Sequence, residues 1–169
     1  MNRGAARAAV VGCGFAALAS IAMPLRAQVQ NTTLTITGGS ASTFAQPSLA
    51  DYVTGYIDGP TISYKVDVAG GPSGKTHTVT VEICATTTTL GSGKAIAKLM
   101  WQASGSPTWN AMTSSCAGAV DPARSVSTTT MSKGDTFSSS VKLRMVLDWT
   151  DTAASYGATV AMTVNVSTP

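Results

Sequence analysis

The feature that most constrains the fold of this chain is a period-two alternation of apolar and polar residues. Such alternation places apolar side chains on one face of an extended segment and polar side chains on the other, as in half-buried antiparallel strands. Five clear runs cover residues 33–37, 62–68, 78–83, 141–149 and 159–166. Weaker strands are predicted around residues 43–46, 95–103 and 124–131. After residue 27 no stretch keeps an apolar helical stripe for two turns, so the sequence predicts an all-β fold.

Turn-forming residues separate these runs. Clusters rich in glycine, proline and serine recur at residues 38–40, 58–60, 70–74, 91–93, 105–107 and 133–135. Short strands with one apolar face each, divided by such turns, are typical of two packed sheets. We therefore predict an antiparallel β-sandwich, immunoglobulin-like or pilin-like, with about seven to eight strands.

Residues 1–27 have the three parts of a secretory signal peptide. Arginines near the start give the positive charge, an apolar run follows, and cleavage is predicted after Ala27, with Ala22 as the alternative. The remaining residues, 28–169, are long enough for a single domain with a core of its own. No second membrane-spanning segment is predicted, so we expect an exported protein that is secreted, periplasmic or at the cell surface.

The charge balance of residues 28–169 argues against one large class of functions. Three of the eleven Lys and Arg residues lie in the leader, so eight basic residues remain against eight acidic ones. A formally neutral domain without a basic cluster lacks the electrostatic signature of a nucleic-acid-binding protein. We expect no nucleic-acid partner, and no membrane association after signal cleavage.

Two cysteines follow the leader, Cys84 and Cys116. In an oxidising compartment an even pair predicts a disulfide, whereas two free buried thiols are the alternative. Cys84 falls on the polar side of its alternating run, so this bond would tie a surface loop across that strand. The third cysteine, Cys13, lies in a segment similar to a lipoprotein box, but few apolar residues precede it, and we expect signal cleavage instead of acylation.

The sequence contains no motif for catalysis or for metal or cofactor binding. The sole histidine, His77, has no nucleophile motif beside it and shares the parity of the apolar residues in its run, which favours a structural role. Asp148 and Asp151 lack the glycine-spaced oxygen ligands of a calcium loop, so a capped turn is expected there. We therefore predict no enzyme activity, no cofactor and no metal.

Aromatic residues outside the strands are the remaining candidates for binding. Trp109, Tyr52 and Tyr56 lie in loop-like segments, where aromatic rings can stack on sugars or anchor a partner, or simply cover the ends of the sheets. Trp101 and Trp149 stand at the apolar positions of their alternating runs, so their side chains are predicted to face the core. Trp109 is then the one tryptophan expected to be partly exposed.

The order of the segments resembles a known family. An extended first strand is followed by an aromatic mid-chain region, Leu99-Met100-Trp101 with Trp109, and then by a Tyr156-Gly157 turn into a long alternating last strand. This order resembles the spore coat protein U-like subunits of archaic chaperone–usher pili. The resemblance implies a pilin-like fold, no catalytic residue, and association with itself or with other surface subunits.

The first strand offers a route to such association. Residues 28–37 form an extended segment ahead of a Gly38-Gly39 hinge, with Leu34 and Ile36 placed to fill a groove of a neighbouring subunit by strand donation. The same segment is equally suited to be the first strand of its own sheet. The sequence thus predicts a secreted, non-catalytic structural or adhesive protein of the cell surface. The alternative is a monomeric extracellular module that binds carbohydrate or protein through its loop aromatics.

Overall fold

The computed structural model describes residues 31–39, 42–70 and 74–167 of the chain. The predicted signal peptide, residues 1–27, lies outside the described residues. The elements are β1 (Thr32–Gly38), β2 (Ser42–Phe44), α1 (Leu49–Thr54), β3 (Tyr56–Val68), β4 (Thr76–Ala85), the 3₁₀ turn η1 (Ile96–Lys98), β5 (Leu99–Ala103), β6 (Asn110–Ala111), β7 (Ser125–Ser132), β8 (Thr136–Val146), β9 (Tyr156–Ala158) and β10 (Val160–Ser167). In this part of the chain no helix has the length and apolar character needed to cross a membrane.

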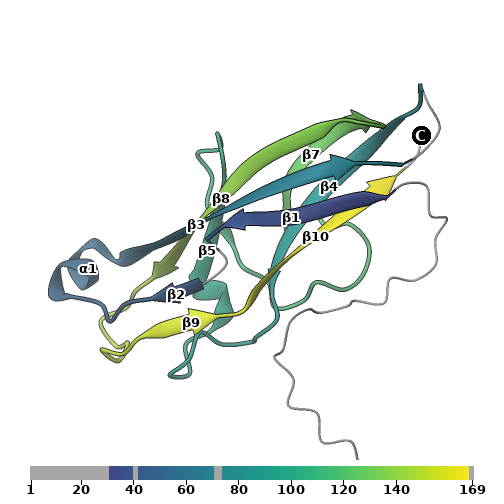
Figure 1. The fold of residues 1–169 in the computed structure, drawn as a ribbon. Helices are drawn as coiled ribbons and strands as arrows, with labels where there is room; N and C mark the ends of the chain where they lie inside the picture. The colour runs from purple at the N-terminus through teal and green to yellow at the C-terminus, as the bar shows by residue number, and fades with distance from the viewer. Residues whose placement is uncertain (1–30, 40–41, 71–73, 168–169) are drawn as a thin grey trace, which may run out of the picture.

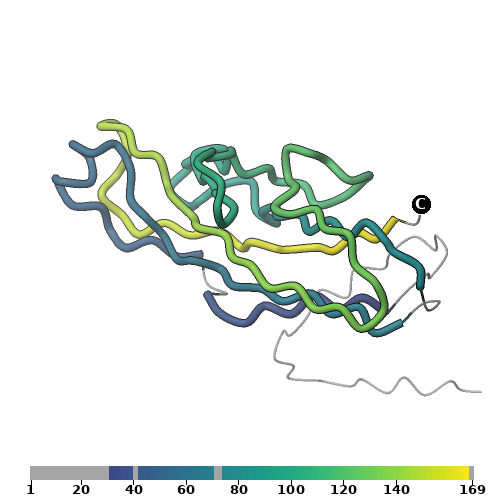
Figure 2. Tube along the Cα trace, turned by 90° about the horizontal axis from the view of Figure 1, so that it is seen from above, coloured from purple at the N-terminus to yellow at the C-terminus, as the bar shows by residue number. Residues whose placement is uncertain are grey.

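The strands form antiparallel sheets, as the alternation predicts. One sheet has the order β1-β3-β8-β5-β6, a second has the order β10-β4-β7, and β2 pairs with β9 in a short two-stranded sheet. The long strands run along the long axis of an elongated molecule, as both views show (Figures 1 and 2). Each of the five clear alternating runs overlaps a strand, and the three weaker predictions overlap β2, β5 and β7. The first part of the prediction at residues 95–103 forms η1 instead, and the turn predicted at residues 58–60 lies inside β3, at a register shift between Asp58 and Thr61. The all-β, antiparallel prediction is therefore confirmed.

The hydrophobic core is built from the apolar faces of the two larger sheets. Val66 on β3 and Leu143 on β8 belong to the same buried cluster as Val81 and Ile83 on β4. Trp101 on β5 is also part of this cluster, as its parity predicts. One continuous core is what the alternating runs require, because each strand has only one apolar face to bury.

The alternation of residues does not predict the short helix α1 between β2 and β3. In α1 the Ser48 side chain accepts a hydrogen bond from the Asp51 amide, and the Asp51 carboxylate accepts one from the Ser48 amide at 2.7 Å. Gly55 ends the helix in the left-handed region, at φ 82°. The capping box and the closing glycine were readable signals. The helix has only six residues, too few to show an apolar stripe.

The prediction that Trp149 extends the core face of β8 is wrong. The strand ends at Val146, and the Trp149 side chain is 68% exposed. The chain turns away because the Asp148 amide donates to the Asp151 carboxylate at 2.6 Å, which caps a tight turn. Alternation does hold as far as the buried Leu147. Trp149, and not the half-buried Trp109, is therefore the most exposed tryptophan.

Candidate functional site

Two strand edges lie side by side along one long side of the molecule. β1 is the outer strand of the five-stranded sheet, and β10 is the outer strand of the three-stranded sheet. The two strands are neighbours in space (Figure 1), yet each pairs only with a strand of its own sheet, β3 and β4 respectively. Each therefore keeps a row of backbone N–H and C=O groups without a strand partner among the described residues.

The core-facing side chains of β10 are incompletely covered. Met162 and Val164 pair across strands with Ile83 and Val81 of β4. Ile83 and Val81 are 0% and 1% exposed, whereas Met162 and Val164 are only half-buried. Since directly paired residues share a face, the difference in exposure matches the edge position of β10, which has no described strand on its outer side. We call this strip the apolar edge; it consists of Leu34, Ile36, Val160, Met162, Val164 and Val166.

The two residues predicted for strand donation border this apolar edge. Leu34 and Ile36 lie on β1 and pair with the buried Val66 and Tyr64 of β3 in the same chain. Their side chains share the core face, but Leu34 is half-buried and Ile36 is 40% exposed. Donation of this segment to a second copy would require β1 to leave β3, and it stays a prediction.

The apolar edge is closed at one end by the pairing of β2 with β9. Ser42 pairs with Ala158, and the Ser42 hydroxyl donates to the Ala158 carbonyl. At the same end, the chain leaves β1 through Gly39, whose φ is 70°. A Cβ atom at this position would collide with the Thr61 carbonyl oxygen. Glycine is therefore required where the chain leaves β1.

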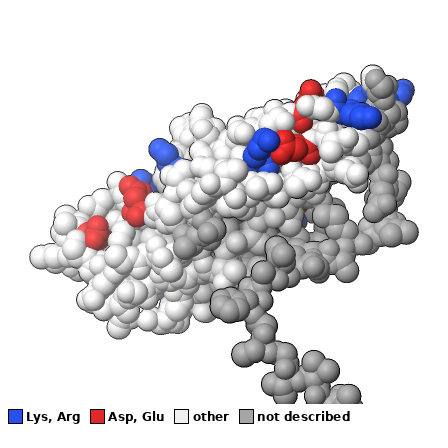
Figure 3. All heavy atoms as spheres, in the orientation of Figure 1, with Lys and Arg blue, Asp and Glu red and all other residues white. Residues whose placement is uncertain are grey.

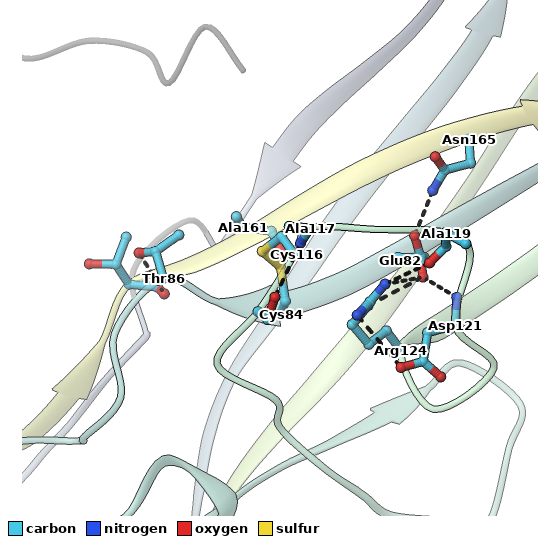
Figure 4. The surroundings of a disulfide bond; sticks show 12 residues. Glu82, Cys84, Thr86, Cys116, Ala117, Ala119, Asp121, Arg124, Ala161 and Asn165 are labelled. Atoms are coloured by element: carbon cyan, nitrogen blue, oxygen red, sulfur yellow. Dashed lines mark hydrogen bonds and ion pairs between the residues drawn. A yellow bond between two sulfur atoms is a disulfide. The ribbon is translucent and has the colours of Figure 1, made fainter. Parts of the chain in front are cut away.

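On the outward face of the three-stranded sheet, the disulfide holds the loop between β6 and β7 against β4 (Figure 4). Cys84 on β4 is bonded to Cys116, with their Cα atoms 5.5 Å apart. The Ala85 amide donates to the Thr113 carbonyl at 2.8 Å, and the Ile83 amide donates to the Arg124 carbonyl at 2.9 Å. The loop is thus fixed to β4 near both of its ends. The predicted disulfide, and its role in tying a loop to this strand, are confirmed.

A buried ion pair lies beside the disulfide (Figure 4). The Glu82 side chain is 3% exposed and accepts hydrogen bonds from the Asp121 amide at 2.7 Å and the Asn165 amide group at 2.6 Å. Arg124, itself buried, donates to the same carboxylate at 3.3 Å and to the Ala119 carbonyl at 3.0 Å. Since both Glu82 oxygens accept hydrogen bonds from the surrounding chain, this network fits a structural role. Glu82 stands at a polar position of its alternating run, which predicts a solvent-exposed side chain. Its burial results from the loop that covers this face.

Two of the three candidate aromatics meet around an arginine. Arg144 on β8 has its guanidinium carbon 3.6 Å from the centre of the Tyr56 ring and 4.3 Å from the centre of the Trp109 ring. Its Nε donates to the Asp58 carboxylate at 2.7 Å. An arginine between two aromatic rings and paired with a carboxylate is held in one orientation. The sequence singled out both rings, but the pairing of β3 with β8 that brings them together is not readable from it.

An open pocket of about 330 Å³ adjoins this arginine. It lies on the face of the five-stranded sheet that points away from the core, because Lys142 and Arg144 alternate with buried residues on β8. Its polar and aromatic lining consists of Asp58, Thr61, Gln102, Trp109, Lys142 and Arg144. Among the described residues no carboxylate forms an ion pair with Lys142.

The third candidate aromatic, Tyr52, lies elsewhere, in α1. Its ring stacks on Trp149 at 5.7 Å, and its hydroxyl donates to the Asp151 carbonyl at 3.1 Å. Burial, followed by the nearby Tyr156 and Asp151, raises the pKa of the Tyr52 hydroxyl. Tyr52 thus joins α1 to the turn that follows β8. It does not contribute to the Arg144 pocket.

The aspartates of that turn form ion pairs with lysines. Asp148 pairs with Lys98 at 3.1 Å, and Asp151 pairs with the buried Lys94. Burial raises the pKa of the Asp151 carboxyl, but hydrogen bonds from Lys94 and the Asp148 amide, with the charges of Lys94 and Lys98, outweigh it and lower the pKa. The expected capped turn is present. Within the described residues no group of three acidic, histidine or cysteine side chains could hold a metal ion.

His77 is buried on the core face of β4, as its parity predicts. Neither of its ring nitrogens has a hydrogen-bond partner in the part of the chain that the structure describes. Its burial on the core face fits the structural role that the sequence favours.

Charged side chains on the face in Figure 3 occur in small groups of both signs, separated by uncharged surface. This matches the balanced charge of residues 28–169. In comparisons with known proteins, the chain matched no protein-family model, no curated protein and no solved structure.

Proposed function

We propose that this protein is an exported, non-catalytic structural subunit of a cell-surface assembly, with a pilin-like β-sandwich to which a neighbouring subunit adds a strand along β10. The observation that carries this proposal is the apolar edge. A half-covered apolar row next to an unpaired strand is a site of aggregation unless another strand covers it.

Strand addition supplies both kinds of interaction that the apolar edge lacks. The backbone of an added strand forms hydrogen bonds with the free edge of β10, which gives affinity. Apolar side chains at every second position of that strand cover Met162, Val164 and Ile36, which fixes the register. A segment with the alternation of residues 28–37 has the required pattern.

Two further features support export and a structural role. The disulfide between Cys84 and Cys116 is the kind of cross-link that persists in an oxidising compartment. The sequence pattern of residues 1–27 is that of a signal for export. The buried titratable residues also fit a structural role: His77 lies within the core and Glu82 lies under a loop, and both are shielded from solvent.

The test is the mass distribution of the exported protein by light scattering, with electron microscopy to detect fibres. The informative variant is Ile36→Lys, because this side chain is 40% exposed in the single chain but would be covered by an added strand. We expect the unaltered protein to assemble, and Ile36→Lys to remain a monomer with a nearly unchanged melting temperature.

The matched control is Thr33→Lys, on the opposite, exposed face of the same strand. It adds the same charge outside the apolar edge and should assemble normally. If the unaltered protein is a monomer at every concentration, or if Ile36→Lys assembles as it does, strand addition at β10 is wrong. A monomer would favour the alternative of a binding module.

A further inference from the structure

We propose that the pocket beside Arg144 binds an acidic saccharide, whose carboxylate pairs with Lys142 while its ring packs against Trp109. The proposal does not depend on assembly, because the pocket lies on the outward face of the five-stranded sheet and the apolar edge lies along β10 and β1.

The floor of the pocket is a row of polar side chains from three neighbouring strands. Lys142 on β8 pairs directly with Thr61 on β3 and with Gln102 on β5. These three residues offer an ammonium, a hydroxyl and a carboxamide side by side on one rigid sheet face. Such a row can both donate and accept hydrogen bonds, which suits the many hydroxyl groups of a sugar.

One wall of the pocket is aromatic and held in place. Trp109 is half-buried, and the guanidinium of Arg144 lies over one face of its ring at 4.3 Å. Because Trp109 also lines the pocket, a ligand there contacts the part of the ring that the guanidinium leaves uncovered. Flat C–H surfaces, as on one side of a pyranose ring, pack well against such a ring.

The net charge of the pocket favours a ligand that carries a carboxylate. Arg144 is neutralised by Asp58, with their atoms 2.7 Å apart, whereas no described carboxylate pairs with Lys142. One net positive charge therefore remains among these groups. A ligand carboxylate at Lys142 forms a charge-assisted hydrogen bond, which a neutral sugar cannot form.

The volume of about 330 Å³ lies at the lower end of the range for small-molecule sites. It fits one or two sugar units of a longer chain. Uronic acids and sialic acids present the same chemistry, a carboxylate on a pyranose ring, and the experiment must tell these two sources apart.

Isothermal titration calorimetry with the full exported protein tests the proposal, with oligogalacturonate and sialyllactose as separate probes. Methyl-esterified oligogalacturonate is the matched ligand control, because it keeps the ring and loses the charge. We expect at least one acidic probe to bind, with affinity about tenfold higher than that of its uncharged counterpart, the ester or lactose.

The variant Lys142→Gln should lower affinity for the acidic probe about tenfold and leave any binding of its uncharged counterpart unchanged. Trp109→Leu should weaken both. Lys133→Gln, in the exposed turn before β8, is the control and should change neither. Because Lys142 is exposed, its replacement should leave the melting temperature unaltered, which separates loss of binding from unfolding.

Four results would overturn the proposal. These are absence of binding of both acidic probes at millimolar concentration, equal binding of the acid and its uncharged counterpart, binding that Lys142→Gln does not weaken, and binding of tetra-aspartate as tight as that of the saccharide. The last result would assign the pocket to acidic peptides instead.

Discussion

The two sides of the three-stranded sheet differ in how well they are covered. Beside the β7 flank, the end of β4 is covered by a loop that a disulfide, a buried ion pair and backbone hydrogen bonds hold in place. On the β10 flank, an apolar row is left half-covered beside an unpaired backbone. Among the described residues, a loop thus covers the outward face of β4 at this end, whereas the core-facing row of β10 stays half-covered. This contrast is what makes the apolar edge a candidate for recognition rather than a defect of packing.

The largest effect is expected at the sealed flank, at Glu82. Replacing Glu82 with Leu leaves the buried Arg124 without its carboxylate, and we expect a loss of about 4 kcal/mol in the free energy of unfolding. Urea denaturation of the purified protein measures it. The double variant with Arg124→Met should recover most of this loss, because it removes the stranded charge. A loss below about 1 kcal/mol for Glu82→Leu would mean that the pair does not seal this flank.

Removal of the disulfide should cost slightly less. The double variant Cys84→Ser and Cys116→Ser opens a loop with a sequence separation of 32 residues, which corresponds to about 3.7 kcal/mol on the chain-entropy model. Comparison of oxidised and reduced protein by chemical denaturation gives an independent value. An unchanged stability would show that the hydrogen bonds at Thr113 and Arg124 hold the loop without the covalent link.

The cover of β10 can be compared with that of the central strand β4 through a pair of valines that face each other across these two strands. Val81→Ala removes fully buried methyl groups and should cost about 2 kcal/mol, whereas Val164→Ala on the half-covered strand should cost about 1 kcal/mol. Both values are measured on the monomer by urea denaturation. Equal losses would mean that β10 is as well covered as the central strand, and the apolar edge would no longer be a half-covered site.

The smallest effect, of opposite sign, is expected at His77. This residue lies on the core face of β4 with both ring nitrogens unpartnered in the described structure, so His77→Leu should raise the free energy of unfolding by about 1 kcal/mol. His77→Asn, which keeps polar atoms at the site, should bring no such gain. A clear loss of stability in His77→Leu would reveal a partner for the imidazole.

The sequence was a good guide to the strands and a poor one to their surroundings. Alternation located β1, β3, β4, β8 and β10 because a strand that buries one face must alternate. Alternation gave a wrong prediction for Trp149, because it does not reveal the turn at Asp148 that follows the end of β8. The parity of Glu82 likewise predicts a solvated face, because parity cannot show that a loop crosses it.

The candidate sites depended on pairing between distant strands, which the sequence does not specify. Trp109 and Tyr56 were recognised as aromatic candidates, but Arg144 and Lys142 were only two basic residues on the polar face of an alternating run. The edge position of β10 follows from the sheet order and not from any property of its residues. A residue's type and parity predict which way it points, and only the topology tells what it meets.

The positions of the two ends of the described chain determine how the protein should respond to tension. β1 begins with Thr32 opposite Val68, and β10 ends with Ser167 opposite Thr78, so both ends leave at the pole where β3 connects to β4 (Figure 1). Tension between these ends would load the hydrogen bonds nearest that pole first and peel β1 and β10 away one bond at a time. A strand lying along the whole of β10 and pulled along its axis would instead load all its bonds together, in shear. The protein should thus yield easily between its own ends and resist strongly along a strand added to its edge.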